Sequence, residues 1–134
     1  MGQTVNLECE ADPSQEQLSQ CLESVHDMLR ECKIPHTMAD GTLLGMYREG
    51  QVPRWDNSVD LSYIQKDAGK LRRCLGDRKI AHESSLTGDS LQFCCPAPGQ
   101  PGPRVRMTGI VPSLSGDFSC ALSEGFEYRT DNFL

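Results

Sequence analysis

The sequence predicts an α+β domain in which helices pack on a mixed β-sheet. Segments with apolar residues at helical spacing alternate with short segments in which apolar and polar residues alternate. Helices interleaved with strands in this way are typical of a layer of helices on a sheet. The chain has 134 residues, which is enough for one domain with its own core. We expect a polar N-terminal arm over residues 1–11 and a single domain over residues 12–134.

The first helix has the clearest signal. Asp12 is a favourable N-cap, Pro13 suits the first helical position, and Gln15 completes a capping-box spacing. The helix is expected to end near Lys33, because Pro35 disfavours helical backbone in the residue before it. Its apolar face, at helical spacing, consists of Leu18, Cys21, Leu22, Val25, Met28, Leu29 and Cys32.

The middle of the chain predicts a short strand, a helix, a second strand and another helix. We expect residues 34–39 to begin a short strand of the edge type, because they contain a proline. A helix is expected from Gly41 to a C-terminal stop at Gly50. Residues 59–64 alternate apolar and polar, as expected of a half-buried strand. Asp67 then caps a helix that we expect to end near Leu75, with Gly76 as its stop.

The last part of the chain predicts further strands. We expect short strands at residues 79–83 and 91–95, separated by a turn at residues 87–89. The Pro- and Gly-rich segment 96–103 is expected to be a loop. Residues 104–111 then predict one more strand, closed by a proline.

Composition excludes several classes of protein. A formal net charge of −6 argues against nucleic acid as the main partner, since phosphate neutralisation needs a basic face. No stretch approaches the roughly 18 apolar residues that span a bilayer. The apolar fraction of 37% is low against a typical value of roughly 45–50%, which favours a thin core or one completed by other protein subunits.

Seven cysteines are a high count for this length. They are Cys9, Cys21, Cys32, Cys74, Cys94, Cys95 and Cys120. The number is odd, no secretory signal precedes them, and no Cys-x-x-Cys or zinc-ligand spacing occurs. We therefore favour buried, reduced thiols over disulfides, and with them a reducing compartment, either the cytoplasm or an organelle interior.

Residues 40–61 combine two features that suit phosphate chemistry. Gly41 and Thr42, at the start of a helix, offer backbone N–H groups and a hydroxyl to an anion, and the helix dipole favours negative charge there. Asp56 lies just before the next strand and Asp60 lies in it. Their carboxylates suit Mg²⁺, which would hold a phosphate against them. Each residue also has a structural explanation: Gly41 as a turn residue, Thr42 as an N-cap, and Asp60 as a solvated strand residue.

These residues resemble the LicD/fukutin family. Gly-Thr-Leu-Leu-Gly at 41–45 is followed by Arg48, a proline, Trp55-Asp56 and then Asp60. The resemblance is best over residues 18–64 and implies the N-terminal part of the family domain. It further implies a nucleotidyltransferase fold, a divalent metal, and transfer of a phosphocholine, phospho-sugar or alditol phosphate group from a nucleotide donor. Asp56 and Asp60 are then the catalytic and metal residues, and Gly41, Thr42 and Arg48 bind the nucleotide phosphates.

The chain departs from the family pattern at the metal site. Residues two apart on a strand share a face and lie about 7 Å apart, whereas residues four apart lie about 13 Å apart. Family members carry an Asp-x-Asp pair, but here Ser58 stands two residues before Asp60. A third carboxylate is expected on a later strand, where Gly109 aligns with the family's aspartate.

Three hypotheses follow. The first is a degenerate module that serves as a non-catalytic binding or structural subunit of a larger assembly. The second is an active, Mg²⁺-dependent transferase in which Asp56 and Asp60 share the metal. The third is a small globular domain whose motif arose by chance.

Overall fold

The computed structural model describes residues 7–50, 57–85, 90–97 and 99–111 of the chain. In chain order its elements are α1 (Gln15–Glu31), β1 (His36–Met38), α2 (Asp40–Glu49), β2 (Ser58–Ile64), the 3-10 turn η1 (Gln65–Asp67), α3 (Ala68–Asp77), β3 (His82–Ser84), β4 (Ser90–Cys94) and β5 (Arg104–Ile110). The expected α+β class is confirmed: helices pack on a mixed sheet.

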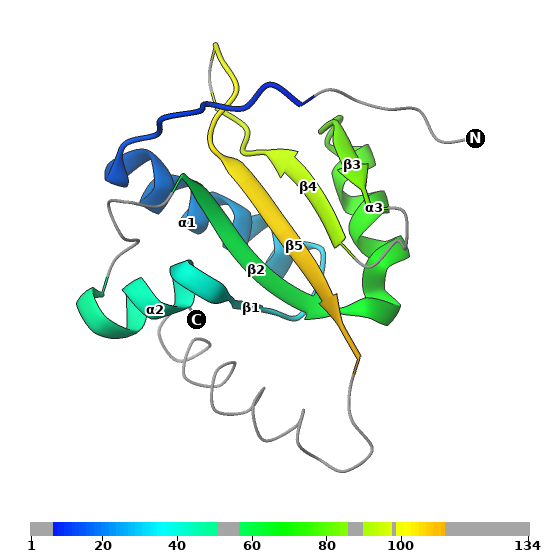
Figure 1. Ribbon diagram of the computed structural model, residues 1–134. Helices are drawn as coiled ribbons and strands as arrows, with labels where there is room; N and C mark the ends of the chain where they lie inside the picture. The colour runs from blue at the N-terminus through cyan, green and yellow to red at the C-terminus, as the bar shows by residue number, and fades with distance from the viewer. Residues whose placement is uncertain (1–6, 51–56, 86–89, 98, 112–134) are drawn as a thin grey trace.

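The five strands form one sheet in the order β1-β2-β5-β4-β3 (Figure 1). The central strands β2 and β5 are parallel, and all other neighbours are antiparallel. A parallel pair needs a crossover connection, and here the chain passes through α3 and the β3–β4 hairpin between β2 and β5. This connection places β5, from late in the sequence, directly beside the strand that carries Asp60.

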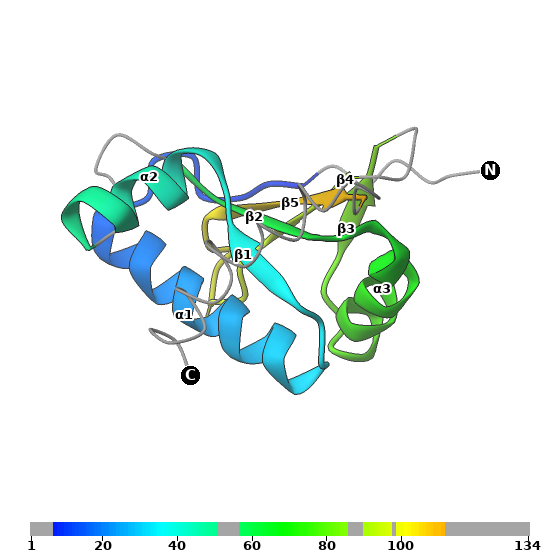
Figure 2. The same ribbon diagram turned by 90° about the horizontal axis from the view of Figure 1, so that it is seen from below.

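One face of the sheet is apolar and covered, and Figure 2 shows α1 and α3 on that side. The strands contribute alternate residues to this face, as the period of two requires, and the two helices cover them with their apolar stripes. The fully buried members include Leu18, Leu29, Leu61, Tyr63, Leu71, Leu75, Leu91, Phe93, Val105 and Met107. The docking of the predicted apolar face of the first helix is thus confirmed.

The start of α1 differs from the expectation. The N-cap is Ser14 rather than Asp12: the Ser14 hydroxyl accepts a hydrogen bond from the Gln17 N–H, and the Gln17 side chain accepts one from the Ser14 N–H. This is a complete capping box, two residues later than expected. Both spacings are present in the sequence, and the geometry of the chain entering the helix selects the second.

The ends of the other two helices show one confirmed prediction and one error. Gly50 caps α2 in the left-handed region, with φ 73°. Gly76 does not end α3, which continues to Asp77. Instead Lys79 adopts the left-handed conformation, and the Ile80 N–H bonds back to the Leu75 carbonyl.

Six of the cysteines form disulfides, which contradicts the expectation of reduced thiols. The pairs are Cys9–Cys94, Cys21–Cys95 and Cys32–Cys74, with Cα–Cα distances of 5.2, 5.9 and 6.1 Å. The partners lie 42 to 85 residues apart in the sequence, so their proximity is a product of the fold. The prediction for Cys120, and that for the turn at residues 87–89, lie outside the described residues.

No helix among the described residues is long and apolar enough to cross a bilayer.

Candidate functional site

The start of α2 is bonded directly to β2. Thr42 is fully buried, and its hydroxyl oxygen accepts a hydrogen bond of 2.9 Å from the Asp60 N–H. One turn earlier, the Ala39 N–H donates to the Asp60 carbonyl, also at 2.9 Å. Both main-chain groups of Asp60 are therefore held by the chain entering α2, and this fixes the residue at the N-terminal end of that helix.

The Asp60 side chain lies on the polar face of the sheet in a compact cluster with Ser58 and Arg106. The Ser58 hydroxyl donates to Asp60 Oδ1 at 3.2 Å. Arg106 donates through Nε to Asp60 Oδ1 at 2.9 Å and through Nη2 to Oδ2 at 3.4 Å. Nη2 also reaches Ser58 Oγ at 3.0 Å. The guanidinium thus bridges both carboxylate oxygens and the neighbouring hydroxyl, the contact geometry that arginine favours with carboxylates.

The strand register explains why Arg106 reaches this position. In the parallel β2–β5 pair Asp60 lies opposite Arg106, whereas Gly109 lies opposite Tyr63. Residue 109 is an odd number of positions from 106, so the two occupy opposite faces of the sheet. The expected alignment of Gly109 with a third metal carboxylate is therefore wrong. The residue beside Asp60 on the neighbouring strand is a cation.

The polar face continues along β5 toward the N-terminal arm. Arg104 Nη1 donates to Gln92 Oε1 at 2.7 Å and lies 3.7 Å from Glu83 Oε1. A groove of about 370 Å³ separates this part of the sheet from the arm; its lining includes Leu7 to Ala11, Ser58, Arg104 and Arg106. The Cys9–Cys94 disulfide and the Glu10 N–H to Gly102 carbonyl bond hold the arm in place.

The structure brings together only part of the predicted site. Gly41 and Thr42 lie in the first turn of α2, and the Thr42 hydroxyl bonds to the main chain of Asp60. Arg48 lies exposed in the last turn of the same helix, and six residues of helix separate it from Thr42 by about 9 Å. Asp56 lies outside the described residues.

A divalent metal does not fit the cluster around Asp60. Mg²⁺ needs carboxylates that are free to face it, but both Asp60 oxygens are engaged by the Arg106 guanidinium. Ser58 supplies a hydroxyl where a second carboxylate is expected. Across the described ranges, no three His, Cys, Asp or Glu side chains are grouped so that they would hold a metal ion.

Sequence reasoning missed Arg106, and the signal that would have identified it is weak. The sequence predicted a strand over residues 104–111, and the alternation Arg104-Val105-Arg106-Met107 within it is compatible with both arginines sharing one face. That pattern does not predict which strand pairs with residues 104–111 or the register of the pairing. Only the parallel pairing with β2 brings Arg106 to Asp60.

The fold is nucleotidyltransferase-like, as two solved structures show. The solution structure of the antibiotic-resistance factor ANT(2'')-Ia matches with a TM-score of 0.56 at 14% identity, over 75% of this chain and 50% of that chain. The lincomycin-bound lincosamide antibiotic adenylyltransferase LnuA matches with a TM-score of 0.53 at 13% identity, over 78% and 61% of the two chains. The chain therefore spans about half to three fifths of the length of these structures. At such identities the likeness concerns the fold alone.

The family is indicated by the sequence of the central region. Residues 33–92 match the family described as LicD/FKTN/FKRP, nucleotidyltransferase domain. The matched region runs from the end of α1 to the middle of β4 and includes the Thr42–Asp60 link. The resemblance to the LicD family is thus confirmed over this segment. No curated protein sequence matches the chain.

Proposed function

We propose that the chain is a degenerate LicD-type nucleotidyltransferase module that serves as a non-catalytic binding or structural subunit of a larger assembly. The observation that carries the proposal is the position of Arg106. Its guanidinium contacts both oxygens of Asp60 and the hydroxyl of Ser58, in the place where the family pattern requires carboxylates around a cation. A positive charge beside Asp60 repels a divalent ion.

The energetics of the cluster support a structural role. Asp60 is only 11% exposed at its side chain, while Arg106 is 51% exposed. Moving Arg106 away would leave a largely buried carboxylate without its charged partner, which costs more than breaking a surface ion pair. The pair therefore favours keeping the groove in its present form over opening it for a metal.

The second candidate is the active, Mg²⁺-dependent transferase, which moves a phosphocholine, phospho-sugar or alditol phosphate group from a nucleotide donor. One observation favours it: Thr42 and Asp60 still join the N-terminus of α2 to β2, so a phosphate at that helix end would lie near a carboxylate. This reading needs Asp56 as a further ligand and needs Arg106 to leave Asp60.

Titration calorimetry with Mg²⁺ or Mn²⁺ and nucleoside triphosphates or diphosphates separates the two candidates. We expect no metal-dependent nucleotide binding by the wild type. The double variant Ser58→Asp/Arg106→Asp places three carboxylates on one face of two adjacent strands and should gain Mn²⁺ binding on the order of millimolar. Arg106→Met alone removes the guanidinium without adding a carboxylate and should gain little.

A contrary result is equally clear. Micromolar binding of Mg²⁺–nucleotide by the wild type, lost in Asp60→Asn but kept in Asp77→Asn, would establish the active transferase in place of the degenerate module. Asp77 is a suitable control because it is an exposed aspartate at the end of α3.

We further propose that the chain matures in an oxidising compartment. Three disulfides among the described residues support this, because cytosolic thiols are kept reduced. This oxidising compartment replaces the reducing one that we inferred from the sequence.

A further inference from the structure

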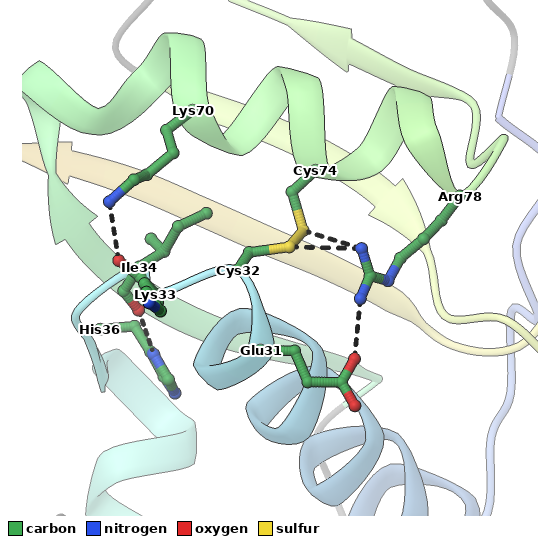
Figure 3. Close-up of a disulfide and its surroundings, with 8 residues drawn as sticks. All are labelled: Glu31, Cys32, Lys33, Ile34, His36, Lys70, Cys74 and Arg78. Atoms are coloured by element: carbon green, nitrogen blue, oxygen red, sulfur yellow. Dashed lines mark hydrogen bonds and ion pairs between the residues drawn. A yellow bond between two sulfur atoms is a disulfide. The ribbon is translucent and has the colours of Figure 1, made fainter.

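The Cys32–Cys74 disulfide has an unusual charged neighbour. It joins the C-cap residue of α1 to α3, and Arg78, the C-cap residue of α3, lies beside it (Figure 3). Arg78 Nη1 lies 3.3 Å from the sulfur of Cys32 and 3.7 Å from that of Cys74. Its Nη2 donates to Glu31 Oε1 at 2.7 Å. A fixed positive charge thus directly contacts both sulfur atoms.

We propose that Cys32–Cys74 is a thiol–disulfide exchange site for a dithiol reductant, and that Arg78 makes it the most readily reduced disulfide among the described residues. The chemical reason is that reduction produces thiolates, and a nearby arginine stabilises a thiolate far more than it stabilises a neutral disulfide sulfur. A group that favours the reduced form moves the exchange equilibrium toward reduction.

The other two disulfides lack this combination of charge and access. Cys21 and Cys95 are 3% and 2% exposed, so an attacking thiol cannot reach them in the folded state. Cys9 and Cys94 are partly exposed, but among the described residues no guanidinium is hydrogen-bonded to either sulfur. Cys32 is partly exposed and Cys74 is 4% exposed, which offers one sulfur for attack and shelters the other.

The exchange reaction follows from this asymmetry. The thiolate of the reductant attacks Cys32 Sγ, the Cys32–Cys74 bond breaks, and Cys74 leaves as a thiolate beside Arg78 Nη1. The second thiolate of the reductant then attacks the reductant sulfur that is bonded to Cys32 Sγ, which closes the reductant's disulfide and releases Cys32 as a thiolate. Two electrons pass from the dithiol, which becomes a disulfide, to the protein, which gains two thiolates that take up protons according to pH.

Contacts around the site keep the two helices close when the bond is open. Glu31 and Arg78 pair across α1 and the end of α3, and Lys70 Nζ donates to the Lys33 carbonyl at 2.9 Å (Figure 3). Ile34 and Leu75, next to these residues, are buried in the core. The reduced form therefore keeps the two sulfurs near each other, and the exchange is reversible.

The test is equilibration of the whole chain in dithiothreitol redox buffers, followed by acid quenching, differential alkylation and mass spectrometry of each cysteine. In the wild type we expect Cys32 and Cys74 to become reduced at a lower dithiol fraction than the other two pairs. Arg78→Met should shift the Cys32–Cys74 equilibrium constant about three- to tenfold toward the disulfide. Glu31→Gln, which removes the competing carboxylate, should shift it in the opposite direction.

The two variants remove the same ion pair, so a purely structural effect would move the equilibrium the same way in both. That result, or reduction of Cys9–Cys94 ahead of Cys32–Cys74 in the wild type, overturns the proposal. Arg73→Met is the matched control: Arg73 is an exposed arginine of α3, and among the described residues no hydrogen bond joins it to a sulfur. Its loss should leave the constant within about twofold. Circular dichroism of each oxidised variant establishes that it is folded.

Discussion

At the scale of single residues, two contacts between side chains shape this protein. Arg106 and Asp60 determine the character of the polar face, since the arginine takes up the carboxylate that a metal would need. The second contact joins two histidines, His26 on α1 and His36 on β1, with His26 Nδ1 and His36 Nε2 2.8 Å apart. It lies on the covered face of the sheet and holds α1 against an edge strand.

The protonation states of the two histidines follow from their partners. His36 Nδ1 lies 2.9 Å from the Ile34 carbonyl, which only accepts, so Nδ1 carries the proton. Nε2 of neutral His36 is then the acceptor for the Nδ1–H of His26. Burial lowers the pKa of His36 to about 4; the Ile34 carbonyl opposes this shift, and the charge of His26 adds to it.

This lowered pKa predicts a loss of stability in mild acid. The pKa of His36 is about 4 in the folded state and 6.5 in the unfolded state, so the unfolded chain binds the extra proton between these values. The free energy of unfolding should therefore fall as the pH drops from 6.5 toward 4, by up to about 3 kcal/mol. Denaturant unfolding across this range measures it.

A histidine substitution isolates that contribution. His36→Asn should flatten the fall between these pH values, while His82→Asn, which changes a partly buried histidine on β3, should retain it. An unchanged pH profile in His36→Asn would show that another group causes the loss.

At the scale of elements, α1 is the main cover of the sheet. Leu22 and Leu29 are 3% and 0% exposed in the core. Leu22→Ala and Leu29→Ala should each lower the free energy of unfolding by about 2–5 kcal/mol, through lost burial and the remaining cavity. Glu23→Ala, on the exposed side of the same helix, should change it by less than about 0.5 kcal/mol. Melting curves that coincide for all three variants would contradict the docking of α1.

The loop after β4 depends on a glycine. Gly102 and Cys95 are joined by the Gly102 N–H to Cys95 carbonyl bond of 2.9 Å, and a Cβ at position 102 would lie 2.6 Å from that carbonyl oxygen. Because the obstacle is backbone, Gly102→Ala should cost about 1–3 kcal/mol of stability. Gly69→Ala is the matched control: it meets open space on α3 and should be neutral or stabilising. Equal melting temperatures for the two variants would mean that the loop can move aside.

At the scale of the whole molecule, the disulfides connect parts that the sheet alone does not. Cys9–Cys94 holds the arm, Cys21–Cys95 fastens α1 to the chain after β4, and Cys32–Cys74 joins α1 to α3. A domain with a low apolar fraction gains from such links, because each restricts the unfolded chain.

Alkylation without reductant, followed by peptide mapping, tests the pairing. We expect the three disulfide-linked peptide pairs to be found intact and their six cysteines to be unmodified. Cys21→Ser/Cys95→Ser, which removes the buried pair, should cost about 2–5 kcal/mol of stability. Stoichiometric labelling of all these thiols in the folded protein would restore the reducing compartment inferred from the sequence.

The sequence by itself determined most of the local elements and the resemblance to the LicD family over the central region. Helical spacing from Leu18 to Leu29, alternation through Val59 and Tyr63, and the Gly-Thr motif at 41–42 are all short-range patterns, and the backbone periodicities that produce them are local. Local signals were nevertheless ambiguous where the sequence offers two N-cap residues for one helix, as at Asp12 and Ser14.

Only the tertiary structure decided the disulfides and the state of the candidate site. The cysteine partners lie 42 to 85 residues apart, and Arg106 lies 46 residues from Asp60. The parallel register of β2 and β5 sets Arg106, and not Gly109, beside the aspartate. A shift of one residue in that register would turn every side chain of β5 to the other face. Contacts of this kind depend on which strands become neighbours, and no pattern within either strand contains that information.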